Sequence, residues 1–334
     1  MTVDKYGLDD IIRESYKEFK GYLKRAGIEI KDVRLRILES SNLLRELYYM
    51  INTYNINKLK QELNTIDKSS LEKIFNDNDI YIINEDNLRK FYIGQIYLLR
   101  QIYNTDDIKE LNNKILEHIV NLIENEKLLA IVIPETKEIY IIKDRLEERI
   151  DETLNTLGPI NINGPSIIRL GWPLFDVVSA PLYTKEENIK EDVAKVFAAN
   201  VIIYEMGRFI VGREELENKE LSVSALQYIM YIDMYKLLKH PKTYEIIEEN
   251  IIECKKYIEK ITTFMANLTD GNFPISLLKD YFNVLRIAPY DLGQCYANII
   301  IDRNKKTSYL NIKDVIEEVK NLSISDALTK IAYY

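Results

Sequence analysis

Four side chains have the chemistry most often used for metal binding and for nucleophilic or acid–base catalysis. They are Cys254, Cys295, His118 and His240, the only cysteines and histidines of the chain. Two cysteines are too few for a four-cysteine zinc site or a disulfide framework, and the four positions lack the close paired spacing of a zinc finger. We therefore expect both thiols to be reduced, on helix faces, and both histidines to lie at helix surfaces or ends.

One segment has the spacing of a catalytic motif, while GxxxxGK[ST], GxGxxG and GxSxG are all absent. It is Val201–Ile210, which reads VIIYEMGRFI and follows an apolar helical stretch. Zinc metallopeptidases carry HExxH on a helix, because residues four apart share a face and both imidazoles then reach one metal while the glutamate activates water. The five residues Tyr204–Arg208 therefore resemble a zincin helix of the HEMGH type in which both histidines are replaced.

The two replacements decide what this resemblance implies. A phenol at Tyr204 and a guanidinium at Arg208 do not make a zinc site, since arginine stays protonated and repels the cation. The resemblance thus implies no metal or other cofactor, with Glu205 left as a relic of the general base. Arg208 would take the place of zinc and pair with Glu205, with Asp233 or with a carboxylate ligand. Together with Tyr290, these residues form the candidate binding site.

Three flanking segments are also similar to parts of zincins. Residues 128–142 resemble the edge of the small sheet beside the zinc helix. Leu221–Tyr228 resembles the helix that donates the third ligand in gluzincins, which places that ligand position on Ser222 or Ser224. Ala288–Gly293 is similar to turns that follow the ligand helix. The resemblance covers about residues 128–300.

The composition limits the class of protein. The chain has 45 basic and 53 acidic residues, a net charge of −8, which disfavours nucleic acid as a partner. It shows no apolar run long enough to span a membrane and no signal peptide, so we expect an intracellular protein without a membrane partner. Its abundant Ile, Tyr, Asn and Lys fit either a hyperthermophile or an AT-rich genome.

Proline placement divides the chain. All eight prolines lie at or after Pro134, which predicts a helical region over residues 1–127. A mainly helical domain over residues 128–334 should follow, so the fold class is mainly α (α+β). The helices predicted in the first region are Asp9–Arg25, Val33–Asn55, Ser69–Asn76, Glu85–Tyr103 and Asp107–Asn125.

In the second region, two short β-branched runs around Pro134 predict a β-hairpin over 128–142. Residues 158–184 hold four prolines and predict a long functional loop that would cover the site. Tyrosines at 228, 231 and 235 are spaced as a packing stripe. The predicted helices are Arg145–Leu157, Lys185–Val211, Leu221–Leu238, Thr243–Asn267, Ile275–Leu285, Asp291–Asp302 and two short ones at the C-terminus.

These observations favour a catalytically silent zincin-like protein, a pseudo-metallopeptidase that binds a ligand or a protein or peptide partner at the former active-site cleft. Two other classes stay open. One is a non-enzymatic helical scaffold or assembly subunit, encoded by a virus or plasmid of a thermophilic host. The other is a hydrolase that uses glutamate and aspartate without histidine.

Overall fold

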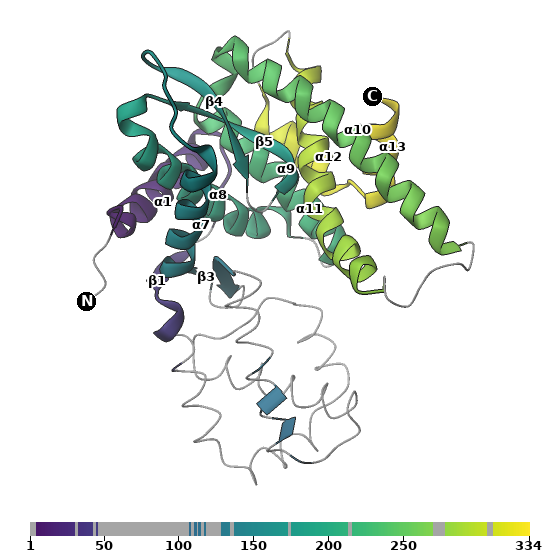
Figure 1. Cartoon of the computed structure of the whole chain (residues 1–334), viewed down its shortest axis with the longest axis horizontal. Helices are drawn as coiled ribbons and strands as arrows, with labels where there is room; N and C mark the ends of the chain where they lie inside the picture. The colour runs from purple at the N-terminus through teal and green to yellow at the C-terminus, as the bar shows by residue number, and fades with distance from the viewer. Residues whose placement is uncertain are drawn as a thin grey trace. The chain divides into compact units, whose positions relative to one another are not determined.

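A computed structural model describes most of the second half of the chain and parts of the first (Figure 1). It divides into two compact units, Met1–Ile30 with Arg149–Tyr334, and Lys31–Glu148. This division differs from the predicted boundary after residue 127, because the first helix packs against a helix of the C-terminal part. The described residues are 5–30, 33–42, 45, 107, 110–111, 113–114, 117, 128–133, 137–172, 175–212, 216–269, 278–305 and 310–334.

The unit Lys31–Glu148 contains a three-stranded sheet in the order β1-β3-β2. Strand β3 (Glu138–Ile142) pairs antiparallel with β2 (Ala130–Ile133), which confirms the hairpin. Its other edge pairs in parallel with β1 (Arg34–Leu38). The prediction of a helix from Val33 is therefore wrong for these residues, whose alternation of arginine with leucine and isoleucine suits a half-buried strand.

The other predicted helices of this unit fall mostly outside the described residues. Ser69–Asn76 and Glu85–Tyr103 lie wholly outside them, and within Asp107–Asn125 the described residues 110, 111, 113, 114 and 117 are helical.

The other unit is mainly helical, as predicted. Its helices form where apolar residues recur at helical spacing, and they agree with the predicted ranges to within a few residues in most cases. They are α1 (Leu8–Arg25), α7 (Lys143–Leu157), α8 (Ile189–Val211), α9 (Leu216–Met234), α10 (Pro241–Thr269), α11 (Leu278–Arg303), α12 (Ile312–Lys320) and α13 (Ile324–Tyr333), with 3-10 turns η1 (Glu186–Asn188) and η2 (Leu237–Lys239). Helix α7 belongs to this unit only from Arg149 to its end.

One helix in this unit replaces two predicted ones. The sequence predicts separate helices over residues 275–285 and 291–302. The structure has a single helix, α11, that runs through Pro289. A proline in a helix interior costs about 3 kcal/mol, and the extensive packing of α11 against α9 offsets that cost.

Helix α9 is the centre of this unit. Every residue from Glu220 to Ile232 is buried, so the helix is enclosed on all sides by α8, α11 and α12. Small residues let its neighbours approach closely. A Cβ atom on Gly293 of α11 would lie 2.3 Å from the carbonyl oxygen of Leu221, and one on Gly207 of α8 would lie 3.3 Å from Val223 Cγ1. Helix α11 thus approaches the backbone of α9 directly, whereas α8 packs on a side chain of α9.

The long loop predicted over 158–184 is wrong from Ser166 onward. Strands β4 (Ser166–Trp172) and β5 (Phe175–Thr184) form an antiparallel hairpin there. Side chains of α9 and α10 hold β5. Tyr228 and Tyr231 donate hydrogen bonds of 2.9 and 2.7 Å to the carbonyl oxygens of Ser179 and Pro181, and the Asn250 carboxamide bonds both the N–H and the C=O of Ser179 at 2.9 Å.

Cys254 and Cys295 form a disulfide, so the prediction of two reduced thiols is wrong. The helices α10 and α11 pack side by side and bring the two Cα atoms to 5.6 Å, within the usual range for this bond. Spacing in the sequence could not show this, because the residues are 41 positions apart. Disulfides are typical of oxidising compartments and of intracellular proteins from hyperthermophiles.

We expect the purified protein to contain no free thiol. Both cysteines are fully buried and bonded to each other. A thiol-specific reagent should therefore label neither residue in denaturant alone, and both residues once a reductant is added. Mass spectrometry of the labelled chain measures this. Labelling of two thiols without reductant would contradict the disulfide.

Among the described residues, no helix is both long enough and apolar enough to cross a membrane.

Candidate functional site

A cluster of charged and aromatic side chains lies where α8 crosses α9. Helix α8 supplies Tyr204, Glu205 and Arg208, with Tyr204 and Arg208 four residues apart on one face. Helix α9 supplies Glu220. Arg208 Nη2 lies 3.0 Å from Glu220 Oε1, and Arg208 Nε lies 3.3 Å from Glu205 Oε2. One guanidinium therefore bridges carboxylates from two helices.

Two tyrosine rings complete the cluster. The hydroxyl of Tyr204 donates a hydrogen bond to Glu220 Oε2, and the Arg208 guanidinium lies over the Tyr204 ring at 5.3 Å from its centroid. The ring of Tyr290, from α11, stacks on Tyr204 with centroids 6.0 Å apart. The Ser224 hydroxyl donates a 2.7 Å hydrogen bond to the backbone oxygen of Tyr290, which holds this turn of α11 against α9.

Both tyrosines are held as neutral phenols. Burial, reinforced by the negative charge of Glu220, raises the pKa of Tyr204 well above its usual value of 10. Burial likewise raises the pKa of Tyr290 to about 12. At neutral pH, Tyr204 is therefore a hydrogen-bond donor to Glu220 and not a phenolate that could ligate a metal ion.

The charges of the cluster are nearly excluded from water. Glu205 and Glu220 are 8% and 5% exposed, and the side chain of Arg208 is 12% exposed. Buried carboxylates of this kind require a cation, and the guanidinium supplies it through ion pairs with both of them. The arrangement is chemically an internal ion-pair network, in which a fixed organic cation occupies the position between the two carboxylates.

Four of the five predicted site residues come together in this cluster, namely Tyr204, Glu205, Arg208 and Tyr290. Asp233 does not, because, of the partners considered for Arg208, the structure shows Glu205 but not Asp233. It lies thirteen residues after Glu220 on the same helix, about 20 Å along the axis, and accepts a 2.9 Å hydrogen bond from Tyr22 of α1. Burial raises the pKa of its carboxyl. Asp233 thus joins α1 to α9.

Glu220 is the functional residue that the sequence did not reveal. The predicted positions for a third ligand, Ser222 and Ser224, instead donate hydrogen bonds to the backbone oxygens of Val319 and Tyr290. The signal for Glu220 is its place at the start of a stretch, residues 221–232, that contains no other charged residue. An acidic residue there is buried with the rest of the helix and needs a partner.

The strands beside α8 are not the ones that the sequence predicts there. The hairpin over 128–142 belongs to the unit Lys31–Glu148, whereas α8 belongs to the other unit. Within its own unit, α8 packs against β5. Tyr228 and Tyr231 of α9 donate the hydrogen bonds to β5 described above, and they lie about 12 Å or more along the helix from Glu220.

No group of three or more His, Cys, Asp and Glu side chains that could hold a metal ion occurs among the residues described. Comparison with protein-family models, with curated proteins and with solved structures found no match to this chain.

Proposed function

We propose that this protein is a catalytically silent, zincin-like protein that acts by binding. One observation carries the proposal. Positions 204 and 208 are those that would hold the two histidines. Their side chains both contact Glu220, a carboxylate of the following helix. The three zinc ligands of a gluzincin converge in the same way. A sheet packs against the same helix, as the resemblance implies, although it is β4–β5 and not the hairpin at 128–142.

Loss of catalysis follows from the two replacements. Arg208 places a permanent positive charge between Glu205 and Glu220, where a zinc ion would otherwise balance them. With the guanidinium there, no Lewis acid polarises a carbonyl group or lowers the pKa of a water molecule. Glu205 is engaged by Arg208 and is not available as a general base.

Binding is the remaining role of such a site. Tyr204, Arg208 and Tyr290 each keep part of their surface exposed, and tyrosine and arginine are the residue types that contribute most to protein interfaces. We propose a protein or peptide partner for this surface. An intracellular location and a thermophilic host stay predictions from the sequence.

The decisive experiment rebuilds the metal site. In the double variant Tyr204→His/Arg208→His, two imidazoles and Glu220 supply a three-ligand set, so we expect one bound zinc ion per chain. Inductively coupled plasma mass spectrometry of the dialysed protein measures the zinc. The unaltered protein should contain none.

The matched control is Tyr204→His/Arg208→His/Glu220→Gln, which keeps both imidazoles and removes the third ligand. We expect it to bind zinc at least tenfold more weakly than the double variant. Stoichiometric zinc in the unaltered protein would contradict the proposal. So would a folded double variant whose zinc affinity matches that of the unaltered chain.

A further inference from the structure

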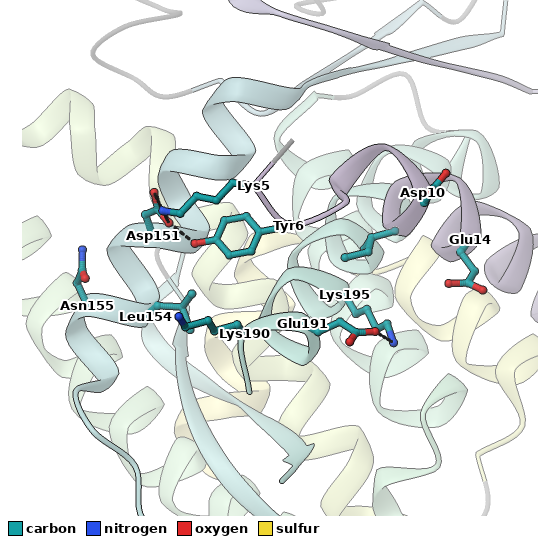
Figure 2. Close-up of a pocket in the computed structure, with 11 residues that line it drawn as sticks. Lys5, Tyr6, Asp10, Glu14, Asp151, Leu154, Asn155, Lys190, Glu191 and Lys195 are labelled. Carbon is teal, nitrogen blue, oxygen red and sulfur yellow. Dashed lines mark hydrogen bonds and ion pairs between the residues drawn. The ribbon is translucent and has the colours of Figure 1, made fainter. Parts of the chain in front are cut away.

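A pocket of about 730 Å³ lies away from the Arg208 cluster (Figure 2). Its walls come from α1, α7 and the first turns of α8, together with the two residues Lys5 and Tyr6 that precede α1. This volume is typical of sites for small ligands. Lys195, its most C-terminal lining residue, lies nine residues before Tyr204, about 14 Å along α8. The pocket is therefore separate from the proposed zincin-like site.

Several of its charged groups neutralise one another. Asp151 of α7 accepts hydrogen bonds from Lys5, at 2.7 Å, and from the Tyr6 hydroxyl. This clamp fixes the residues before α1 against α7. On α8, Lys195 pairs with Glu191 at 2.6 Å. These two groups of side chains build the pocket walls with their charges largely balanced.

The other charged groups are separated by sign. Lys190 extends beside Leu154 and Asn155 of α7, whereas Asp10 and Glu14 lie on the α1 side (Figure 2). Asp10 and Glu14 are four residues apart and so share one face of α1. Within the described chain, Lys190, Asp10 and Glu14 form no salt bridge. The pocket thus presents a cation with an amide on one wall and two carboxylates on another, where Glu14 also interacts electrostatically with Lys195.

We propose that this pocket binds a zwitterionic ligand of the class of short peptides with free amino and carboxyl ends. The carboxylate of the ligand would pair with Lys190 and accept from the Asn155 amide, and its ammonium group would pair with Asp10 and Glu14. A dianion is repelled by the α1 wall and a dication by Lys190. An extended tripeptide spans about 10 Å, which a pocket of this volume accommodates. This inference does not depend on the zincin-like proposal.

Tri-alanine is a suitable probe, because its side chains add no charge. We expect saturable binding to the full-length protein in a titration followed by ligand-observed NMR. N-acetyl-tri-alanine and tri-alanine amide each lose one terminal charge, and each should bind about fivefold more weakly, the upper range for a partly exposed ion pair. Absence of saturable binding would overturn the proposal, as would equal affinity for the capped and free peptides.

Variants of the pocket show which residue contacts the carboxyl end of the ligand and which contacts its amino end. Lys190→Gln should weaken tri-alanine binding but leave the affinity for the peptide amide unchanged. Glu14→Gln should likewise weaken tri-alanine binding, but it should leave the affinity for N-acetyl-tri-alanine unchanged. Lys242→Gln and Glu186→Gln remove exposed charges outside the pocket and serve as controls. Equal weakening by the control variants would show that binding is non-specific and would overturn the proposal.

Discussion

Replacing Gly293 with alanine is expected to lower the free energy of unfolding by about 3 kcal/mol or more. An added Cβ would lie 2.3 Å from the carbonyl oxygen of Leu221 and 3.0 Å from the amide nitrogen of Ala225. Both atoms are backbone atoms of α9, so no side-chain rotation relieves the overlap. Since α9 is enclosed on all sides, either α9 or α11 must shift and open contacts elsewhere. Chemical denaturation followed by circular dichroism measures the loss.

Two other helical glycines provide matched controls for this substitution. In Gly21→Ala, the nearest atom is the mobile end of Arg25 at 3.5 Å, so the alanine should stabilise α1 by up to about 1 kcal/mol. Gly207→Ala should fall between the two, because Val223 Cγ1 at 3.3 Å has to give way slightly. A Gly293→Ala protein as stable as Gly21→Ala would show that α11 does not approach α9 as closely as described.

The helices could be predicted from the sequence because their signals are local. Apolar residues at helical spacing and the glycine after α1 mark its range from nearby residues alone. The hairpin β4–β5 was missed for the opposite reason. Pro181 and Gly171 read as loop residues, yet β5 is held in place by side chains of α9 and α10 that are distant in sequence.

The same distinction explains what could be predicted of the site. Tyr204 and Arg208 share a face because helical periodicity places residues four apart together, so their association was visible in the sequence. Their contact with Glu220 depends on how α9 is rotated against α8, and the two helices pack closely at Gly207 and Val223. The disulfide between Cys254 and Cys295 likewise depends on the packing of two helices. A short window of sequence indicates neither the contact with Glu220 nor the disulfide.

The Arg208→Met variant should have the largest loss of stability among the charge changes, about 3–5 kcal/mol at neutral pH. Methionine retains the apolar length of the side chain but removes the cation, which leaves Glu205 and Glu220 as like charges in a buried site. Each charge then opposes the other in a site nearly closed to water, and protonation of either carboxyl group relieves this repulsion. The loss in the free energy of unfolding should therefore be greatest at neutral pH. It should shrink as the pH falls toward the range in which an ordinary carboxyl group is protonated.

Neutralising Glu205 and Glu220 as well tests whether unbalanced charge, and not lost packing, causes the stability loss of Arg208→Met. In Glu205→Gln/Arg208→Met/Glu220→Gln, no buried charge is left uncompensated, so much of the stability should return and its pH dependence should disappear. Lys256→Met removes a cation that is 58% exposed and paired with Glu253 at 2.7 Å, and it should cost no more than about 0.5 kcal/mol. If the triple variant is no more stable than Arg208→Met across this pH range, the guanidinium acts mainly as a packing group, and the view of Arg208 as a fixed substitute for a metal cation is wrong.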